Sequence, residues 1–292
     1  MKRLIVTADD FGLTEMVNEA IVEAHRRGIV TSTSLMANGG AFEQAVALAR
    51  ENPNLGIGAH LNLTEGQPVA PAVEVQSLLN GGGSLRGGPL GLAKRLVAGK
   101  ADLSHVEREL RAQIEKILAA GVNLTHFDGH KHVQLLPQVF ALVVRLAAEY
   151  KIKGVRCAVE RVPEPIALWR RANGDGALKQ FAIGRGLSLL ASRMKTKAKR
   201  AGLKTPGHFF GIAQTGFLDT GTLNTVLSSL PEGTSELMCH PGYVDDALRR
   251  TPTRLLQQRE TELQALVEPG TRDLISRYNI ELITYRELIE ES

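Results

Sequence analysis

Two adjacent carboxylates, Asp9 and Asp10, stand at the end of a short apolar run near the start of the chain. A buried strand commonly delivers acidic groups to the rim of a sheet in this way. Because neighbouring carboxylates repel each other, one of them should stay protonated unless a cation neutralises the pair. A bound metal ion would provide that cation. The alternative interpretation of the pair is a helix N-cap, since aspartate is favoured at that position.

Histidines stand at or near the ends of three later apolar runs. The members of this set, together with one aspartate, are His60, His126, Asp128, His130, His132 and His240. In parallel α/β architectures the carboxyl ends of the strands converge on one face, where sites are found. We therefore expect these side chains to meet Asp9 and Asp10 at that face. His25 and His105 fall on predicted helices, and we interpret them as structural residues.

Two histidines and one carboxylate form a ligand set that leaves positions open on a divalent ion for water and substrate. Such an ion lowers the pKa of its bound water and polarises a carbonyl oxygen. A second carboxylate can take the proton of that water, and a histidine on another strand end can protonate the leaving nitrogen of an amide. The sequence therefore predicts metal-dependent hydrolysis with one divalent ion, and zinc, magnesium and manganese all stay open.

Segments with the character of strands alternate with segments of helical periodicity along the whole chain, which predicts parallel βαβ units. Strands are expected at residues 4–8, 29–37, 55–63, from 124, 155–159, 209–213, 236–240 and 281–285. Helices are expected at 14–27, 41–50, 90–98, 103–120, 137–150, 218–230 and 253–268. No internal repeat or linker divides the chain. We predict one α/β domain over residues 1–292, a distorted (β/α) barrel of seven or eight mostly parallel strands.

A basic helical insertion is predicted at about residues 160–205. The net charge is +4, but residues 176–218 contain no acidic residue and eight basic ones, which leaves 4 − 8 = −4 for the rest. Ile183, Leu187, Leu190 and Met194 fall at helical spacing, although Gly184 and its neighbour Gly186 disfavour a stable helix start. Two interpretations stay open, a solvated helix packed on the domain and a membrane contact through residues 178–204.

The composition excludes several classes of protein. Aromatic residues make up only 4% of the chain, so a stacking surface for nucleic acid is not expected. No apolar run approaches the length of a membrane span, and the one after Met1 is too short for a signal peptide. Two cysteines without a CxxC motif fit a reducing compartment, so we predict a cytoplasmic protein. Residues 80–91 contain six glycines and are expected to form a mobile loop, and whether it is a lid stays open.

Four segments together resemble the motifs of the YdjC-like carbohydrate deacetylase family. They are Ala-Asp-Asp-Phe-Gly at 8–12, Gly-Ala-His-Leu-Asn-Leu-Thr-Glu-Gly at 58–66, His-Phe-Asp-Gly-His-Lys-His at 126–132 and Met-Cys-His-Pro-Gly at 238–242. They occur in the order of the family and span most of the chain. The resemblance implies a distorted (β/α) barrel that uses a metal ion to remove N-acetyl groups from amino sugars, such as chitin disaccharides.

The resemblance also implies a role for individual residues. Carried over by position, Asp10, His60 and His130 bind the metal ion. Asp9 is then the general base and His240 the general acid. Because the two aspartates are adjacent, an exchange of their roles stays open.

Three further residues receive supporting roles from the same resemblance. Asp128 and His132 would hold the metal ligands in place from behind. Arg156 would contact the substrate.

Residues 209–211 and 235–242 resemble the hopanoid-biosynthesis-associated branch of the family. That branch implies an N-acetylglucosaminyl group on a polycyclic lipid as the substrate, and the basic segment would then dock at the inner membrane face. Four alternatives stay open: a chitin-disaccharide or chitooligosaccharide deacetylase, a metal-dependent phosphoesterase, an aldolase on the same scaffold, and a non-enzymatic membrane or partner-binding protein. The oligomeric state, including a homodimer, also stays open.

Overall fold

Strand β1 (Lys2–Phe11) lies in the middle of a parallel sheet in the computed structural model, which describes residues 1–161 and 175–290. The other strands are β2 (Ser32–Leu35), β3 (Gly56–Leu61), β4 (Leu124–Gly129), β5 (Gly154–Val155), β6 (His208–Phe210), β7 (Gly233–Cys239) and β8 (Ile280–Leu282). Their order is β5-β4-β3-β2-β1-β7-β6, and β8 pairs with the first part of β1. Leu4, Ile5 and Val6 of β1 are completely buried, as expected of a parallel strand covered on both faces.

The outer strands β5 and β6 approach each other through isolated parallel bridges. Gly154 pairs with Lys204, and Glu160 pairs with Phe209. The sheet therefore curls toward closure, although regular pairing is lost between its edges. This arrangement confirms the predicted α/β class and the distorted (β/α) barrel of mostly parallel strands.

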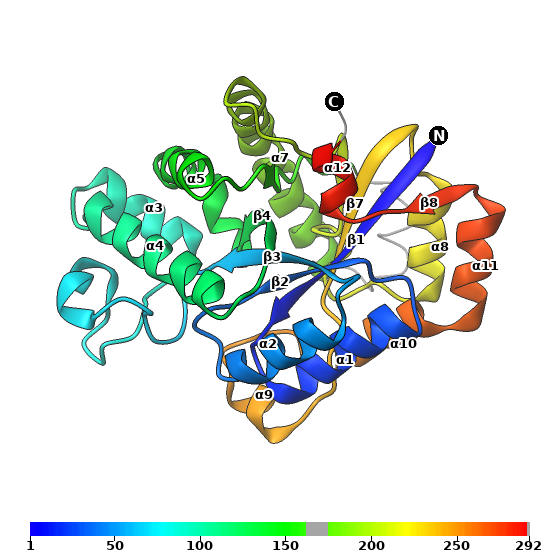
Figure 1. The fold of residues 1–292 in the computed structure, drawn as a ribbon, viewed down its shortest axis with the longest axis horizontal. Helices are drawn as coiled ribbons and strands as arrows, with labels where there is room; N and C mark the ends of the chain where they lie inside the picture. Colours follow the sequence, from blue (N-terminus) through cyan, green and yellow to red (C-terminus); the bar gives the residue numbers. More distant parts are fainter. Residues whose placement is uncertain (162–174, 291–292) are drawn as a thin grey trace.

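Helices surround the sheet (Figure 1). They are α1 (Glu15–Arg26), α2 (Phe42–Glu51), α3 (Pro89–Val97), α4 (Leu103–Ala119), α5 (Pro137–Glu149), α7 (Asp175–Arg200), α8 (Thr220–Ser228), α9 (Asp246–Arg250), α10 (Gln257–Val267), α11 (Pro269–Arg277) and α12 (Tyr285–Glu290). Short 3₁₀ turns form at η1 (Ala72–Glu74), η2 (Gln76–Leu78) and η3 (His130–Leu135). Side chains of Asp102 and Asp219 cap α4 and α8, and proline opens α3, α5 and α11.

Several predicted elements have different limits in the structure. The expected strand at 155–159 is only Gly154–Val155, and the one at 209–213 ends at Phe210 because Gly211 turns the chain with φ +130°. The helix expected from residue 253 begins at Gln257, and the sequence did not indicate α11 after it. Apart from the missed helix α11, these errors concern element ends, where local patterns are weakest.

The basic segment includes α7, whose side chains are described from residue 186 onward. Ala191, Met194 and Ala198 are buried, whereas Arg193 and Lys197 are exposed, which agrees with the predicted amphipathic helix. The helix begins at Asp175, before both glycines, although glycine was expected to disfavour a helix start there. Residues 162–174 of the predicted insertion lie outside the described residues. Within the part that is described, no helix is both long and apolar enough to span a membrane.

Candidate metal centre and active site

A bulge at the end of β1 brings both adjacent carboxylates to one cavity. Ala8 pairs with Thr33 of β2, but the next partners are Phe11 and Leu35, so β1 holds one extra residue. Asp10 lies within this irregular part of β1 and has a positive φ of 70°. A bulge can re-aim a side chain that regular alternation would turn to the other face.

The cavity lined by Asp9 and Asp10 has a volume of about 940 Å³. The two carboxylates belong to β1, and the N-cap of α1 is instead Thr14, whose Oγ1 accepts from the N–H of Val17 at 3.2 Å. The helix-cap interpretation of the pair is therefore wrong.

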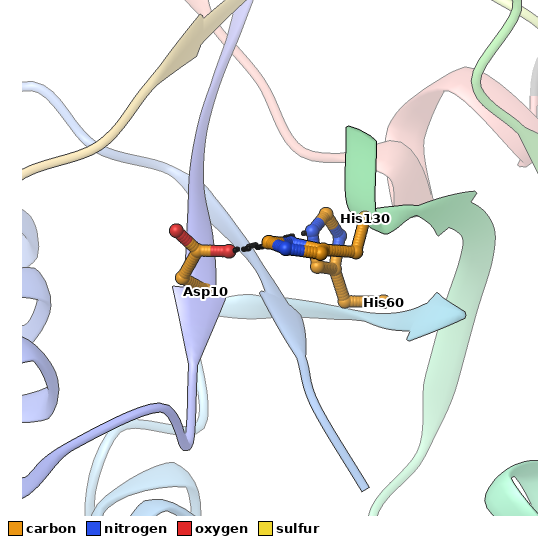
Figure 2. Close-up of side chains that lie close together, drawn as sticks. All are labelled: Asp10, His60 and His130. Atoms are coloured by element: carbon orange, nitrogen blue, oxygen red, sulfur yellow. Dashed lines mark hydrogen bonds and ion pairs between the residues drawn. The ribbon is translucent and has the colours of Figure 1, made fainter. Parts of the chain in front are cut away.

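Asp10, His60 and His130 all line this cavity, and their side chains point toward one another (Figure 2). Asp10 Oδ1 lies 3.1 Å from Nδ1 of His130 and 3.6 Å from Nε2 of His60. His60 belongs to β3, and His130 opens η3 directly after β4. One nitrogen or oxygen from each residue lies within 4.8 Å of the others.

The orientation of His60 is fixed from behind by Asp128. Nδ1 of His60 donates to Asp128 Oδ1 at 2.8 Å, which leaves Nε2 with its lone pair facing Asp10. Asp128 is itself fully buried, accepts a hydrogen bond from Ser34 Oγ, and forms an ion pair with Arg156, whose Nη1 lies 2.9 Å from Oδ2. Burial alone would raise the pKa of Asp128, but Arg156 and the nearby His60 hold it well below its usual range.

His130 contacts a carboxylate at each ring nitrogen. Its Nε2 donates to Glu65 Oε2 at 3.0 Å, and its Nδ1 faces Asp10. Burial opposes protonation of the ring, but the two carboxylates outweigh burial and raise the pKa of His130 to about 9. The sequence interpretation gave no role to Glu65, although the residue lies within the same motif as His60.

Arg259 of α10 is a second residue that the sequence did not reveal. Its Nη2 donates to Asp10 Oδ2, so only Oδ1 of this carboxylate faces the histidines. Burial would raise the pKa of Asp10, but Arg259 and the histidines bring it well below the usual value. A buried arginine on a helix 249 positions away has no local sequence signal that links it to a strand end.

Asp9 is bound by the guanidinium of Arg156 rather than by the histidines. Both Asp9 oxygens accept from Arg156, each at 2.8 Å, and the same guanidinium pairs with Asp128 and Glu236. Nearby carboxylates raise the pKa of Arg156 further against the opposing effect of burial. Because Arg156 is completely buried and engaged by three carboxylates, its position does not favour the expected contact with substrate.

His240 and His132 also line the cavity. The backbone N–H of His240 donates to Glu262 Oε2 at 2.6 Å, and its side chain is 12% exposed. The ring of His132 packs edge-on against Phe209, and burial lowers the pKa of His132 to about 3. His132 contacts none of the three converging residues, so the described contacts give no support to its expected supporting role.

His126 does not join the cluster. Its ring is completely buried and stacks on Tyr285 with the centroids 3.7 Å apart. A Cβ atom at Gly58 would lie 2.4 Å from the ring, so the glycine makes room for it. His126 is therefore a core residue at the level of the sheet.

Among the residues that the structure describes, two groups of side chains have the spacing of a metal site, and only one of them suits a metal ion. Asp10, His60 and His130 supply one oxygen and two nitrogens that face an open cavity, as a catalytic divalent ion requires. Asp9, His60 and Asp128 also lie close together, but Arg156 neutralises both carboxylates of that group. The first group therefore fits a metal ion, and the second fits an internal ion-pair network.

Comparison with known proteins finds relatives that match nearly the whole chain. A carbohydrate deacetylase from Brevibacillus brevis is 36% identical to the chain over 293 residues, which cover 98% of this chain and 99% of that protein. A carbohydrate deacetylase from Geobacillus stearothermophilus is 36% identical over 289 residues, which cover 97% and 96%.

A solved structure shares the fold over nearly the whole chain. An Enterococcus faecalis protein whose proposed role is cellobiose-phosphate cleavage matches with a TM-score of 0.78 and 26% identity, over 98% of both chains. The YdjC-like protein family matches residues 3–277, and the chain therefore belongs to the YdjC-like family.

Proposed function

We propose that this protein is a metal-dependent hydrolase that removes the N-acetyl group from an N-acetylated amino sugar. The relatives named as carbohydrate deacetylases support this activity, since they match nearly the whole chain. The observation that carries the proposal is the convergence of Asp10, His60 and His130 beside Asp9 in one cavity. His240 lines the same cavity.

Asp10, His60 and His130 would hold one divalent ion. Such an ion, when bound, activates a water molecule and polarises the amide carbonyl. Arg259 occupies the second oxygen of Asp10, so this residue would contribute Oδ1 alone and leave positions free for substrate. Asp128 holds Nδ1 of His60 and so directs Nε2 toward the site.

Asp9 would act as the general base and His240 as the general acid. Asp9 accepts the proton of the attacking water, while Arg156 fixes the orientation of both of its oxygens. His240 donates a proton to the sugar nitrogen as the C–N bond breaks. The carboxylate of Glu262 lies 3.8 Å from Nδ1 of His240, on one side of the ring.

The substrate would be an N-acetylglucosaminyl group, carried by a hopanoid lipid. Leu90 of α3 is 69% exposed and lines the cavity together with Leu187 of α7, so an apolar aglycone would find contacts there. The exposed Arg193, Lys197 and Lys199 follow Leu187 along the same helix and would dock at an anionic membrane. The protein would then be cytoplasmic and peripheral at the inner membrane face.

Acetate release from a panel of substrates tests the activity. The panel contains chitooligosaccharides and N-acetylglucosaminyl hopanoid, each assayed with added metal and with a chelator. We expect metal-dependent acetate release with the lipid-linked sugar. Activity on short chitin sugars alone would remove the lipid proposal and favour the chitooligosaccharide alternative, whereas no metal-dependent release from any N-acetyl sugar would remove the deacetylase proposal.

Co-sedimentation with vesicles tests the membrane contact separately. Binding to vesicles of phosphatidylglycerol should weaken when Arg193, Lys197 and Lys199 are replaced by glutamine, because each charge contributes roughly 1 kcal/mol near an anionic surface. Vesicles of phosphatidylcholine serve as the neutral control. Equal binding of wild type and variant would contradict this contact.

A further inference from the structure

The carboxylate of Glu65 lies between two consecutive residues of η3. Its Oε2 accepts from Nε2 of His130 at 3.0 Å, and its Oε1 accepts from Nζ of Lys131. Lys131 and His132 both have positive φ, 54° and 57°, a backbone conformation that is unfavourable for these residues. The contacts of Glu65 therefore reach a segment whose backbone needs support from its surroundings.

The backbone of Glu65 is fixed by two asparagine side chains. Oδ1 of Asn62 accepts from the N–H groups of Thr64 and Glu65, at 2.9 and 3.3 Å. The carbonyl oxygen of Glu65 accepts from Nδ2 of Asn62 at 2.9 Å and from Nδ2 of Asn38 at 3.0 Å. Asn62 and Asn38 also bond to each other at 3.2 Å, which closes the clamp. A loop residue held at both backbone groups has little freedom to move its side chain away.

The clamp is in turn anchored on α4. Gln113 accepts from the N–H of Asn62 at 2.9 Å and donates to the carbonyl oxygen of Asn62 at 2.6 Å. Glu109, one turn earlier, accepts from the N–H groups of Val69 and Ala70. Gln113 and Glu109 are both buried, and they bond to each other at 2.7 Å. A continuous set of hydrogen bonds therefore runs from a rigid helix to the ring of His130.

His60 and His130 each have a carboxylate partner at one ring nitrogen. Asp128 holds Nδ1 of His60 and turns Nε2 of that ring to the site, and Glu65 holds Nε2 of His130 and turns Nδ1 to the site. Without an acceptor at the outer nitrogen, a histidine can present either tautomer and rotate, and its affinity for a metal falls.

We propose that Glu65 is the positioning residue of His130, and that the clamp on Asn62 sets its carboxylate for that purpose. The inference rests on the proposed function, because it assigns to Glu65 a task toward the metal site described above. Glu65 touches neither of the other two ligand residues among its described contacts. Its action on the site therefore passes through the ring of His130.

Zinc binding to the purified chain, measured by calorimetry, tests this role without an activity assay. Replacement Glu65→Ala should weaken zinc affinity by about 10- to 100-fold, the usual effect of losing a partner behind a metal-bound histidine. Glu65→Gln retains an acceptor oxygen and should restore most of the affinity. Glu65→Asp keeps the charge but is shorter by one methylene, so its zinc affinity should stay low. This variant tests the positioning role if Glu65→Ala folds poorly.

Two controls separate the possible outcomes. Glu74→Ala removes a carboxylate that contacts only the exposed Arg108 among its described ion pairs, and it should bind zinc like the wild type. His60→Ala removes a ligand and should abolish binding. Equal zinc affinity of wild type, Glu65→Ala and Glu65→Asp would overturn the positioning role and leave the proposed function intact. If His60→Ala binds zinc as tightly as the wild type, the proposed metal site is wrong, and this inference with it.

Discussion

Both oxygens of Asp9 accept hydrogen bonds from the guanidinium of Arg156, at 2.8 Å each. The adjacent Asp10 instead meets Arg259 with one oxygen and His130 with the other. Two neighbouring carboxylates therefore have different cationic partners, and each partner offsets part of their mutual repulsion. The division also gives a physical basis for assigning the metal to one and the proton to the other.

Replacing each aspartate with asparagine separates these roles. Asp10→Asn should reduce metal affinity by more than the roughly 10- to 100-fold expected for a supporting residue, because it removes a charged ligand. Asp9→Asn should retain the metal but lower turnover by about 10²–10⁴, the usual contribution of a general base. Calorimetry and acetate release measure the two effects. The assignment is reversed if Asp9→Asn loses the metal and Asp10→Asn keeps it.

Removal of Arg156 should destabilise the whole domain. Arg156→Met leaves Asp9, Asp128 and Glu236 buried without their shared cation, so the free energy of unfolding should fall by about 3–5 kcal/mol. Urea denaturation measures this change. The matched control is Arg108→Met, which breaks an exposed pair with Glu74 at 3.7 Å and should change stability by less than about 1 kcal/mol. Similar losses in the two variants would contradict a structural role for the Arg156 network.

The strand ends that carry His60 and His240 could be predicted because a buried apolar run followed by a polar residue is a local signal. The bulge at Asp9 and Asp10 could not, since it depends on how β1 pairs with β2. Regular alternation would have turned these two side chains to opposite faces. Arg259 escaped prediction because its contact with Asp10 joins distant parts of the chain. Burial is also a property of the fold, so the internal ion pairs of the buried Arg156 could not be predicted from local sequence.

Glu160 should make stability depend on pH. Burial raises its pKa from 4.5 to about 7, against the opposing effect of backbone N–H groups that include Ala213. The folded state then holds a proton that the unfolded state has released, so stability falls as pH rises from about 4.5 through 7. Glu160→Gln removes this proton equilibrium. The difference in unfolding free energy between wild type and variant should therefore change by roughly 2 kcal/mol from pH 5 to 8.

Urea denaturation of the two proteins at matched pH values measures that difference. Other titrating groups are common to wild type and variant, so their contributions largely cancel. Glu74→Gln alters a half-exposed carboxylate and should leave the pH profile unchanged. A constant difference between wild type and Glu160→Gln across this pH range would show that the carboxyl group of Glu160 titrates normally.

The proposed role of His240 predicts a dependence on the leaving group. An amide nitrogen leaves only when it is protonated, whereas the phenolate of an aryl acetate leaves readily without a proton. His240→Gln should therefore lower turnover of an N-acetyl sugar by about 10²–10⁴ and lower hydrolysis of 4-nitrophenyl acetate far less. Metal affinity should stay at the wild-type value, because His240 lies outside the Asp10, His60 and His130 group. Asp9→Asn is the matched control, since loss of a general base should slow both substrates. Equal losses on the two substrates in His240→Gln would place His240 in substrate binding or water activation instead of proton donation.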